Sequence, residues 1–272
     1  MVFSYAIVGV GMMGLEHIRN LGLLKRRGAA IRIAALVDDY PESLERGLKE
    51  FEKHFPGDES PRTFASADEL VEGGREEVDA IVLVTPNFTH KGVLDTLFAS
   101  PKPFHILCEK PMCTTVDDAE AVYLAAEARK AVSRFWVAME YRYMPPVARL
   151  LERLPEVGRI RFVSVREHRF PFLRKVRDWN RFSEATGGTL VEKCCHFWNL
   201  LMRVVPGKPS RVFASGGCDV NHLDEKYEGR TPDILDNAMV IVEFEGGVRA
   251  VHELCMFAEG AKNQEELVVV GE

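Results

Sequence analysis

The sequence of 272 residues contains no apolar run of the roughly 18 residues that a membrane-spanning helix requires. It also lacks a basic stretch followed by an apolar stretch at its N-terminus, because an apolar strand pattern begins almost at once. We therefore expect neither a membrane span nor a signal peptide, and predict a cytoplasmic protein.

The six cysteines form no CxxC pair and no dense framework. This usage favours reduced thiols in the cytoplasm over a disulfide scaffold. The run Cys194-Cys195-His196 raises the question of a metal. Adjacent residues on a helix diverge by about 100° and no partner CxxC exists, so we predict packing thiols and no metal site.

A basic excess is also missing, since the formal net charge is −6. This balance argues against a dominant role in nucleic-acid binding, which needs a basic surface. Hydrophobic residues make up 46% and charged residues 28%, as in an ordinary globular protein with ample core.

The first half of the chain alternates apolar runs with helix-spaced segments, which predicts a parallel, doubly wound sheet. The apolar run AIVGV is followed by Leu15, Ile18 and Leu21 at helical spacing. The predicted strands cover residues 6–10, 31–38, 78–85, 104–109 and 135–141, and the predicted helices cover 41–55, 89–99 and 115–131, with a capping box at 66–69.

The second half predicts a mostly antiparallel sheet with helices. Helices are expected at 145–154 and 187–205, strands at 159–170 and 211–215, and a hairpin at 237–257 that turns at 245–247. We place the boundary before Pro145-Pro146, giving domains 1–143 and 144–272. Residues 265–272 read as a strand entering a turn, so we expect the sequence to be a fragment with an incomplete second domain.

Three glycines, Gly9, Gly11 and Gly14, form a G-x-G-x-x-G pattern between the first strand and the first helix. The first glycine allows a tight turn, the second lets the backbone approach a pyrophosphate, and the third lets helix and strand pack closely. The helix N-terminus then offers free N–H groups and a positive dipole end to an anion.

Asp38 ends the second strand, where a carboxylate can accept hydrogen bonds from a ribose 2′-hydroxyl. Asp39 follows, and no Arg or Lys lies within the next five residues. A 2′-phosphate would meet negative charge, which favours NAD over NADP. The alternative reading is a solvated acidic turn.

Three further stretches extend the pattern: TPNFTH (85–90), CEKPM (108–112) and GGTLVEKCCH (187–196). With the glycine loop, and in this order, they resemble the Gfo/Idh/MocA oxidoreductase family over essentially the whole chain. The resemblance implies an α/β fold with an N-terminal Rossmann domain and a C-terminal α/β domain that has an open sheet. It also implies reversible oxidation of a sugar, inositol or polyol hydroxyl by a nicotinamide cofactor.

The resemblance assigns three catalytic candidates. Lys110 of the EKP element would hydrogen-bond the reacting hydroxyl and stabilise a developing alkoxide. His196 would take the hydroxyl proton as the hydride leaves. Glu192 stands where the family usually has Asp, and Cys194 where it usually has Gly, so both departures bear on the substrate. With i,i+4 spacing on a helix, Glu192 would orient the imidazole, bind a substrate hydroxyl or form a salt bridge.

The remaining site predictions fall into two sets. Arg142, Trp179 and Asn180, together with Glu192 and His196, are expected to line the substrate pocket, although Trp179 fits a domain-interface anchor equally well. The cofactor set comprises Gly9, Gly11, Met12, Met13, Gly14, Asp38, Thr85, Pro86, Asn87, His90, Glu109 and Lys110.

Together these features predict an NAD(P)-dependent sugar or polyol dehydrogenase, with NAD as cofactor and a small-molecule substrate. We expect no nucleic-acid or membrane partner and a homo-oligomer formed through the C-terminal sheet. Two alternatives are an NAD-dependent glycoside hydrolase on the same scaffold and a non-catalytic NAD-binding regulator. The sequence leaves the sugar, its carbon and its stereochemistry open.

Overall fold

A computed structural model describes residues 2–272. The chain divides into two compact units, the first ending at Ala138 and the second covering Met139–Glu272. The sequence-based boundary lies five residues later in the chain. Each unit is described by itself.

The first unit is built on a six-stranded sheet in which every neighbouring pair is parallel. The strand order β3-β2-β1-β4-β5-β6 places β1 beside β4, where the order reverses. This is the order of a doubly wound dinucleotide-binding fold. The strands are β1 (Phe3–Val8), β2 (Ile31–Val37), β3 (Arg62–Phe64), β4 (Ala80–Leu83), β5 (His105–Cys108) and β6 (Phe135–Val137).

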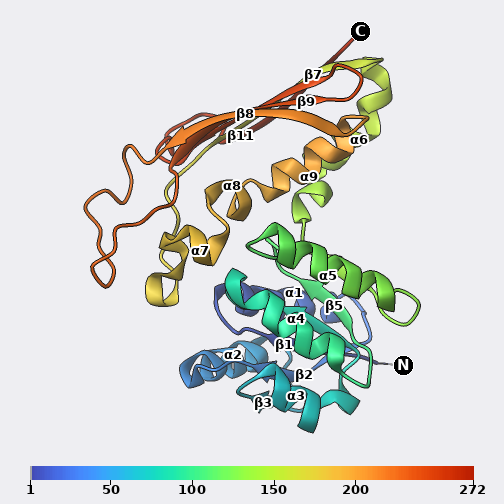
Figure 1. Ribbon diagram of the computed structural model, residues 1–272. Helices are drawn as coiled ribbons and strands as arrows, with labels where there is room; N and C mark the ends of the chain where they lie inside the picture. The colour runs from blue at the N-terminus through green and yellow to red at the C-terminus, as the bar shows by residue number, and fades with distance from the viewer. Residues whose placement is uncertain (1) are drawn as a thin grey trace. The chain divides into compact units, whose positions relative to one another are not determined.

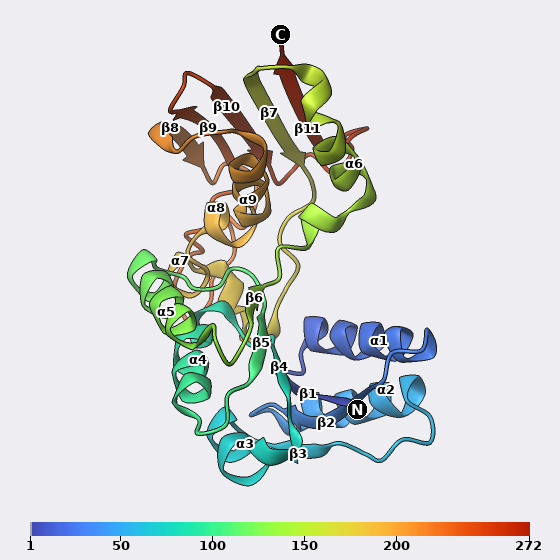
Figure 2. The same cartoon turned by 90° about the vertical axis from the view of Figure 1, so that its right-hand side faces the viewer.

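Helices cover both faces of this sheet, as Figure 2 shows, with α1 and α2 on one side and α3, α4 and α5 on the other. Each helix buries an apolar face: Ile18 and Phe51 pack on one side of the sheet, and Leu94 and Val122 on the other. The helices are α1 (Met12–Arg26), α2 (Pro41–His54), α3 (Ala67–Gly73), α4 (His90–Ala99) and α5 (Val116–Arg129), with 3-10 turns η1 (Arg75–Glu77) and η2 (Asn87–Thr89).

The second unit has a five-stranded mixed sheet in the order β11-β7-β10-β9-β8. Only β7 and β10 pair in parallel, so the predicted mostly antiparallel sheet is confirmed. The predicted hairpin forms between β9 and β10. The strands are β7 (Ile160–His168), β8 (Pro209–Gly217), β9 (Asn237–Phe244), β10 (Arg249–Cys255) and β11 (Glu265–Gly271).

Helices α8 and α9 run along one face of this sheet, as Figure 1 shows. Phe197, Leu200 and Leu201 of α9 are buried against Val165 and Val240 of the strands. The helical elements of this unit are α6 (Pro145–Arg153), α7 (Ser183–Thr186), α8 (Thr189–Glu192) and α9 (Cys195–Val204), with 3-10 turns η3 (Glu140–Tyr143), η4 (Leu154–Val157) and η5 (Val176–Arg181).

The continuous helix predicted for residues 187–205 is wrong. The segment consists of α8 and α9, separated by a turn at Lys193 and Cys194, where Cys194 has φ −85° and ψ −2°. The break lets Lys193 reach Glu167, whose carboxylate has no exposed surface, while Cys194 itself is buried. The i,i+4 argument for Glu192 and His196 therefore does not hold, because the two residues lie on different helices.

The sequence reading also missed the short strand β3, whose three residues are largely exposed and carry no apolar run. No helix within residues 2–272 is both long and apolar enough to cross a membrane.

Candidate active site

The glycine loop has the geometry that a dinucleotide requires. Gly9 has φ +97°, and a Cβ there would lie 2.6 Å from the backbone carbon of Val84. A Cβ on Gly14 would lie 2.2 Å from the carbonyl oxygen of Gly9. Both positions are therefore restricted to glycine by packing and, at Gly9, by backbone conformation.

Gly11 differs from the other two glycines, because a Cβ there would meet nothing within 4 Å. It is the N-cap residue of α1, and the first turn of that helix contains no acidic side chain. Met12 is half exposed at the same end. The space beside Gly11 and the positive end of the helix dipole together suit an anionic pyrophosphate.

Asp38 follows β2 and is held in place by the backbone on both sides. Its Oδ2 accepts a hydrogen bond from the Val10 N–H at 2.6 Å, and its Oδ1 accepts one from the Tyr40 N–H at 3.0 Å. The neighbouring Asp39 is exposed. The carboxylate thus stands beside the glycine loop, as a ribose-binding acid would.

The segment after β4 presents a buried amide. Asn87 is 7% exposed, and its Nδ2 has no hydrogen-bond partner among the described residues. An unsatisfied buried donor is costly, so Asn87 is a candidate for a ligand contact. Thr85 is fixed nearby, where its Oγ1 accepts a hydrogen bond from Thr89 Oγ1 at 2.7 Å.

His90 was predicted in the cofactor set, but it is fully buried. Its Nε2 lies 2.9 Å from the Thr85 carbonyl oxygen and its Nδ1 lies 3.0 Å from the Pro111 carbonyl oxygen. Burial lowers the pKa of His90, although the backbone carbonyls oppose that shift. Its place indicates that it ties the segment after β4 to the segment after β5.

Glu109 follows β5 and pairs with a histidine that the sequence reading missed. Its Oε1 lies 2.8 Å from His17 Nε2 of α1, and its Oε2 accepts a hydrogen bond from the Lys110 N–H at 3.1 Å. Burial alone would raise the pKa of Glu109, but the hydrogen bond and charge of His17 outweigh it and hold the pKa below its usual value. Glu109 is thus anchored to α1, next to the lysine of the EKP element.

In the second unit, His196 is the second residue of α9 and is 2% exposed. Its Nε2 lies 3.3 Å from Oε1 of Glu140, an exposed residue of η3 that was not predicted. Glu192, also buried, ends α8. Residue 140 lies 56 positions before residue 196 in the chain, so spacing along one helix could not have identified the pair.

A cluster of potential metal ligands is buried in the second unit. Atoms of Glu167, Cys194 and His252 that can bind metal come within 4.8 Å of one another. Glu167 Oε1 already pairs with Lys193 Nζ at 2.9 Å and Arg169 Nη1 at 3.1 Å, and burial raises the pKa of the Cys194 thiol well above its usual value. Two cations and a protonated thiol make a poor site for a divalent ion.

The other predicted substrate residues take varied places within the second unit. Arg142 donates from Nε to the Met139 carbonyl oxygen at 3.2 Å. Asn180 is fully buried and donates from Nδ2 to the Leu173 carbonyl oxygen at 2.9 Å, which indicates a structural role. Its neighbour Trp179 is partly exposed.

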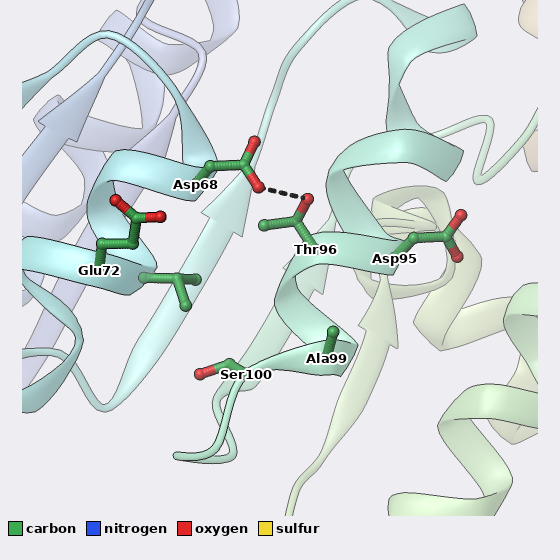
Figure 3. A pocket seen from close by; sticks show the side chains of 7 residues that line it. Asp68, Glu72, Asp95, Thr96, Ala99 and Ser100 are labelled. Atoms are coloured by element: carbon green, nitrogen blue, oxygen red, sulfur yellow. Dashed lines mark hydrogen bonds between the residues drawn. The ribbon is translucent and has the colours of Figure 1, made fainter.

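A hollow of about 390 Å³ lies between α3 and α4, and Figure 3 shows side chains that line it. None of the predicted site residues lines it. Its walls include Asp68, Glu72 and Asp95, and Asp68 accepts a hydrogen bond from Thr96 Oγ1 at 3.2 Å. The acidic walls would repel a phosphate, so this hollow does not serve the predicted chemistry.

The fold agrees with the comparisons to known proteins. A model of the oxidoreductase family's NAD-binding Rossmann fold matches residues 3–138, and a model of its C-terminal alpha/beta domain matches residues 154–272. The chain therefore belongs to the Gfo/Idh/MocA oxidoreductase family, which confirms the resemblance seen in the sequence. The first unit is the NAD-binding Rossmann domain of that family.

Individual relatives differ in their named activities. The chain is 24% identical over 248 residues to 2,7-anhydro-N-acetylneuraminate hydratase from Mediterraneibacter gnavus, covering 89% of this chain and 61% of the relative. It is 34% identical over 145 residues to inositol 2-dehydrogenase from Mycolicibacterium smegmatis, covering 53% and 38%. The chain thus spans less than two thirds of either relative.

Among solved structures, the WlbA dehydrogenase from Bordetella pertussis, in complex with NADH and UDP-GlcNAcA, superimposes with a TM-score of 0.80. The match has 21% identity and covers 100% of this chain and 77% of the other. At this identity the likeness shows the fold.

Proposed function

We propose that this chain is the core of an NAD-dependent oxidoreductase acting on a hydroxyl of a sugar, inositol or related polyol. The observation that carries the proposal is a group of residues in the first unit that together suit a dinucleotide. Gly11 leaves space at an unopposed helix N-terminus, Asp38 is held beside the loop, and Asn87 keeps an unpartnered donor. Relatives named as inositol 2-dehydrogenases support the substrate class.

In this proposal residues 1–143 bind the cofactor and residues 144–272 bind the substrate. Bound NAD supplies the hydride acceptor. His196 takes the hydroxyl proton, and the Glu140 carboxylate lies 3.3 Å from its Nε2. Lys110 stabilises the developing alkoxide, and Glu192 holds a neighbouring substrate hydroxyl.

We also propose NAD rather than NADP. The Asp38 carboxylate is fixed by two backbone N–H groups, so it cannot swing away from an incoming 2′-phosphate without losing both hydrogen bonds. The exposed Asp39 adds a second negative charge. Like-charge repulsion at this point penalises the phosphorylated ribose.

We propose that the chain forms a homo-oligomer through the second unit's sheet, on the face that is turned away from α9. Register places Met239 and Ile241 on the same face as Phe213, and Val270 opposite Phe162. All five are exposed. An exposed apolar surface of this kind marks an interaction site.

The acidic net charge supports the absence of a nucleic-acid partner. The six free cysteines support a cytoplasmic setting.

The test is a nicotinamide absorbance assay of the full chain with NAD or NADP across inositols, aldoses and sugar acids. Reduction of NAD by one group of substrates supports the proposal and names its substrate class. NAD binding without reduction by any substrate counts against it.

A second candidate is favoured by one observation, the relative named as a hydratase. An enzyme of that kind, or an NAD-dependent glycoside hydrolase, would convert its substrate with no net formation of NADH. Chromatography of the same reaction mixtures, with aryl glycosides and anhydro sugars added, separates this candidate from a dehydrogenase. A non-catalytic regulator would bind NAD and convert nothing in either assay.

A further inference from the structure

A tyrosine that was not among the predicted site residues lies flat against the proposed base. The ring centroids of Tyr141 and His196 are 4.1 Å apart and the two planes differ by 4°. This is a parallel stack at close van der Waals distance, and it fixes the plane of the imidazole. Both residues belong to the second unit.

The Tyr141 ring is itself held on two further sides. Its hydroxyl lies 2.7 Å from Glu265 Oε1 of β11 and 3.2 Å from Lys193 Nζ. The ring of Phe197 meets it edge-on, with centroids 5.5 Å apart and planes at 85°. Because its hydroxyl and its edge are held, the Tyr141 ring presents a fixed plane to the His196 imidazole.

The anchoring charges extend into the core of the unit. Lys193 Nζ also lies 2.9 Å from Glu167, which is fully buried, so the ammonium is held between a carboxylate and the phenol. Burial raises the pKa of Tyr141, and the hydrogen bond to Glu265 raises it further. The phenol therefore stays neutral, donates to Glu265 and accepts from Lys193.

The adjacent residue completes the arrangement. Glu140 lies 3.3 Å from His196 Nε2, so it sets the direction of the imidazole within the plane that Tyr141 defines. Both residues come from the same short turn, η3. One turn thus fixes the plane and the direction of the imidazole.

We infer that Tyr141 is a positioning residue that holds the His196 imidazole in its reactive orientation through the ring stack. The inference rests on the proposed function, in which His196 is the base. It concerns the aromatic face of residue 141, and the hydroxyl serves to anchor that face.

The first experiment tests the stack without any activity. Histidine labelled at 13Cε1 gives one ring signal per residue, and the His196 signal is assigned by its loss in His196→Gln. Stacking on Tyr141 shifts this signal upfield. Tyr141→Phe keeps the upfield shift, and Tyr141→Leu moves the signal toward the position of an unstacked histidine. An unmoved signal in Tyr141→Leu overturns the stack.

The second experiment tests the consequence in the full chain, using the substrate found by the absorbance assay. Tyr141→Leu lowers kcat by roughly ten- to a hundredfold, because a misaligned base loses the proximity contribution. The KM for NAD stays unchanged, and Tyr141→Phe restores kcat to within about threefold of the wild-type value. Tyr141→Met carries the same expectation if the leucine variant does not fold.

Tyr123→Leu, at an exposed position of α5, is the matched control and leaves kcat and the His196 signal unchanged. A moved signal with unchanged kcat in Tyr141→Leu overturns the positioning role. Wild-type turnover in His196→Gln would instead overturn the proposed function, because His196 would not be the base. The labelled spectra would still decide whether the stack exists.

Discussion

The Asp38 carboxylate lies 2.6 Å from the backbone nitrogen of Val10, so the acid that ends β2 is bonded directly to the loop that ends β1. The two features that the sequence offers for dinucleotide binding, the glycine pattern and the acid, are therefore one connected structure. A change at Asp38 acts on the ribose end of the site and on the shape of the loop.

Replacing Asp38 with Asn tests the ribose end of this structure. The amide oxygen can still accept from one of the two backbone N–H groups, but the second hydrogen bond and the negative charge that opposes a 2′-phosphate are gone. We expect the preference for NAD over NADP to fall by about tenfold, or 1.4 kcal/mol. Calorimetric titration with both cofactors measures it. An unchanged preference would show that Asp38 does not face the ribose, and Asp117→Asn, at an exposed position of α5, serves as the control.

Two glycine variants separate folding from binding. Gly9→Ala places a Cβ 2.6 Å from the Val84 carbon at φ +97°, so we expect a loss of stability of about 2 kcal/mol or more. Gly11→Ala meets no atom within 4 Å, so its melting temperature should stay close to the wild-type value. Its NAD affinity should nevertheless fall by about tenfold or more.

Thermal denaturation and NAD titration of the two variants give the answer. If Gly11→Ala binds NAD as tightly as the wild type, the space beside Gly11 does not receive the cofactor.

The ion pair between His17 and Glu109 predicts that the stability of the fold depends on pH. The pKa of Glu109 is lowered in the folded chain, so its contribution to stability is present above the unfolded pKa and is lost as the pH falls through the folded pKa. We expect His17→Leu to cost about 1 kcal/mol at pH 7, and the difference from the wild type to shrink as the pH approaches 3. Urea denaturation at several pH values tests this, and a difference that stays constant with pH would contradict it.

His252 predicts a second dependence of stability on pH, and here the titrating group is a base and not an acid. It is buried in β10 beside the rings of Phe197 and Trp198, and neither ring nitrogen has a hydrogen-bond partner among the described residues. Burial lowers its pKa to about 4. The unfolded chain therefore binds the proton first as the pH falls below the ordinary value of about 6.5, and stability declines from there down to pH 4.

Between pH 8 and pH 5 this single residue should reduce the free energy of unfolding by about 2 kcal/mol. His252→Leu removes that part of the pH dependence, as urea titrations at the two pH values would show. An equally steep decline in the variant would place the titrating group elsewhere.

Patterns within single elements predicted much of this structure. The alternation of buried strands with helices gave the parallel sheet, and the turn at 245–247 gave the hairpin of β9 and β10. The glycine pattern correctly marked the turn between β1 and α1, where the contacts of Gly9 and Gly14 leave no room for a Cβ.

Tertiary pairings were beyond the sequence reading. The break between α8 and α9 has no proline or glycine to mark it, and it places Lys193 against a buried carboxylate of β7. His17 in the first unit contacts Glu109, 92 positions away. Glu140 and Tyr141 in the second unit contact His196, 56 and 55 positions away. Such contacts depend on how the elements pack, which periodicity does not encode.

The most direct test of the proposed function uses Lys110→Met and His196→Gln in the full chain, with Lys102→Met, on the loop before β5, as the matched control. NAD affinity and the rate of NADH formation with the identified substrate are measured for each variant. We expect both site variants to bind NAD, with turnover reduced by about a hundredfold or more, and the control to match the wild type. Turnover at the wild-type rate in both site variants would contradict the proposed chemistry.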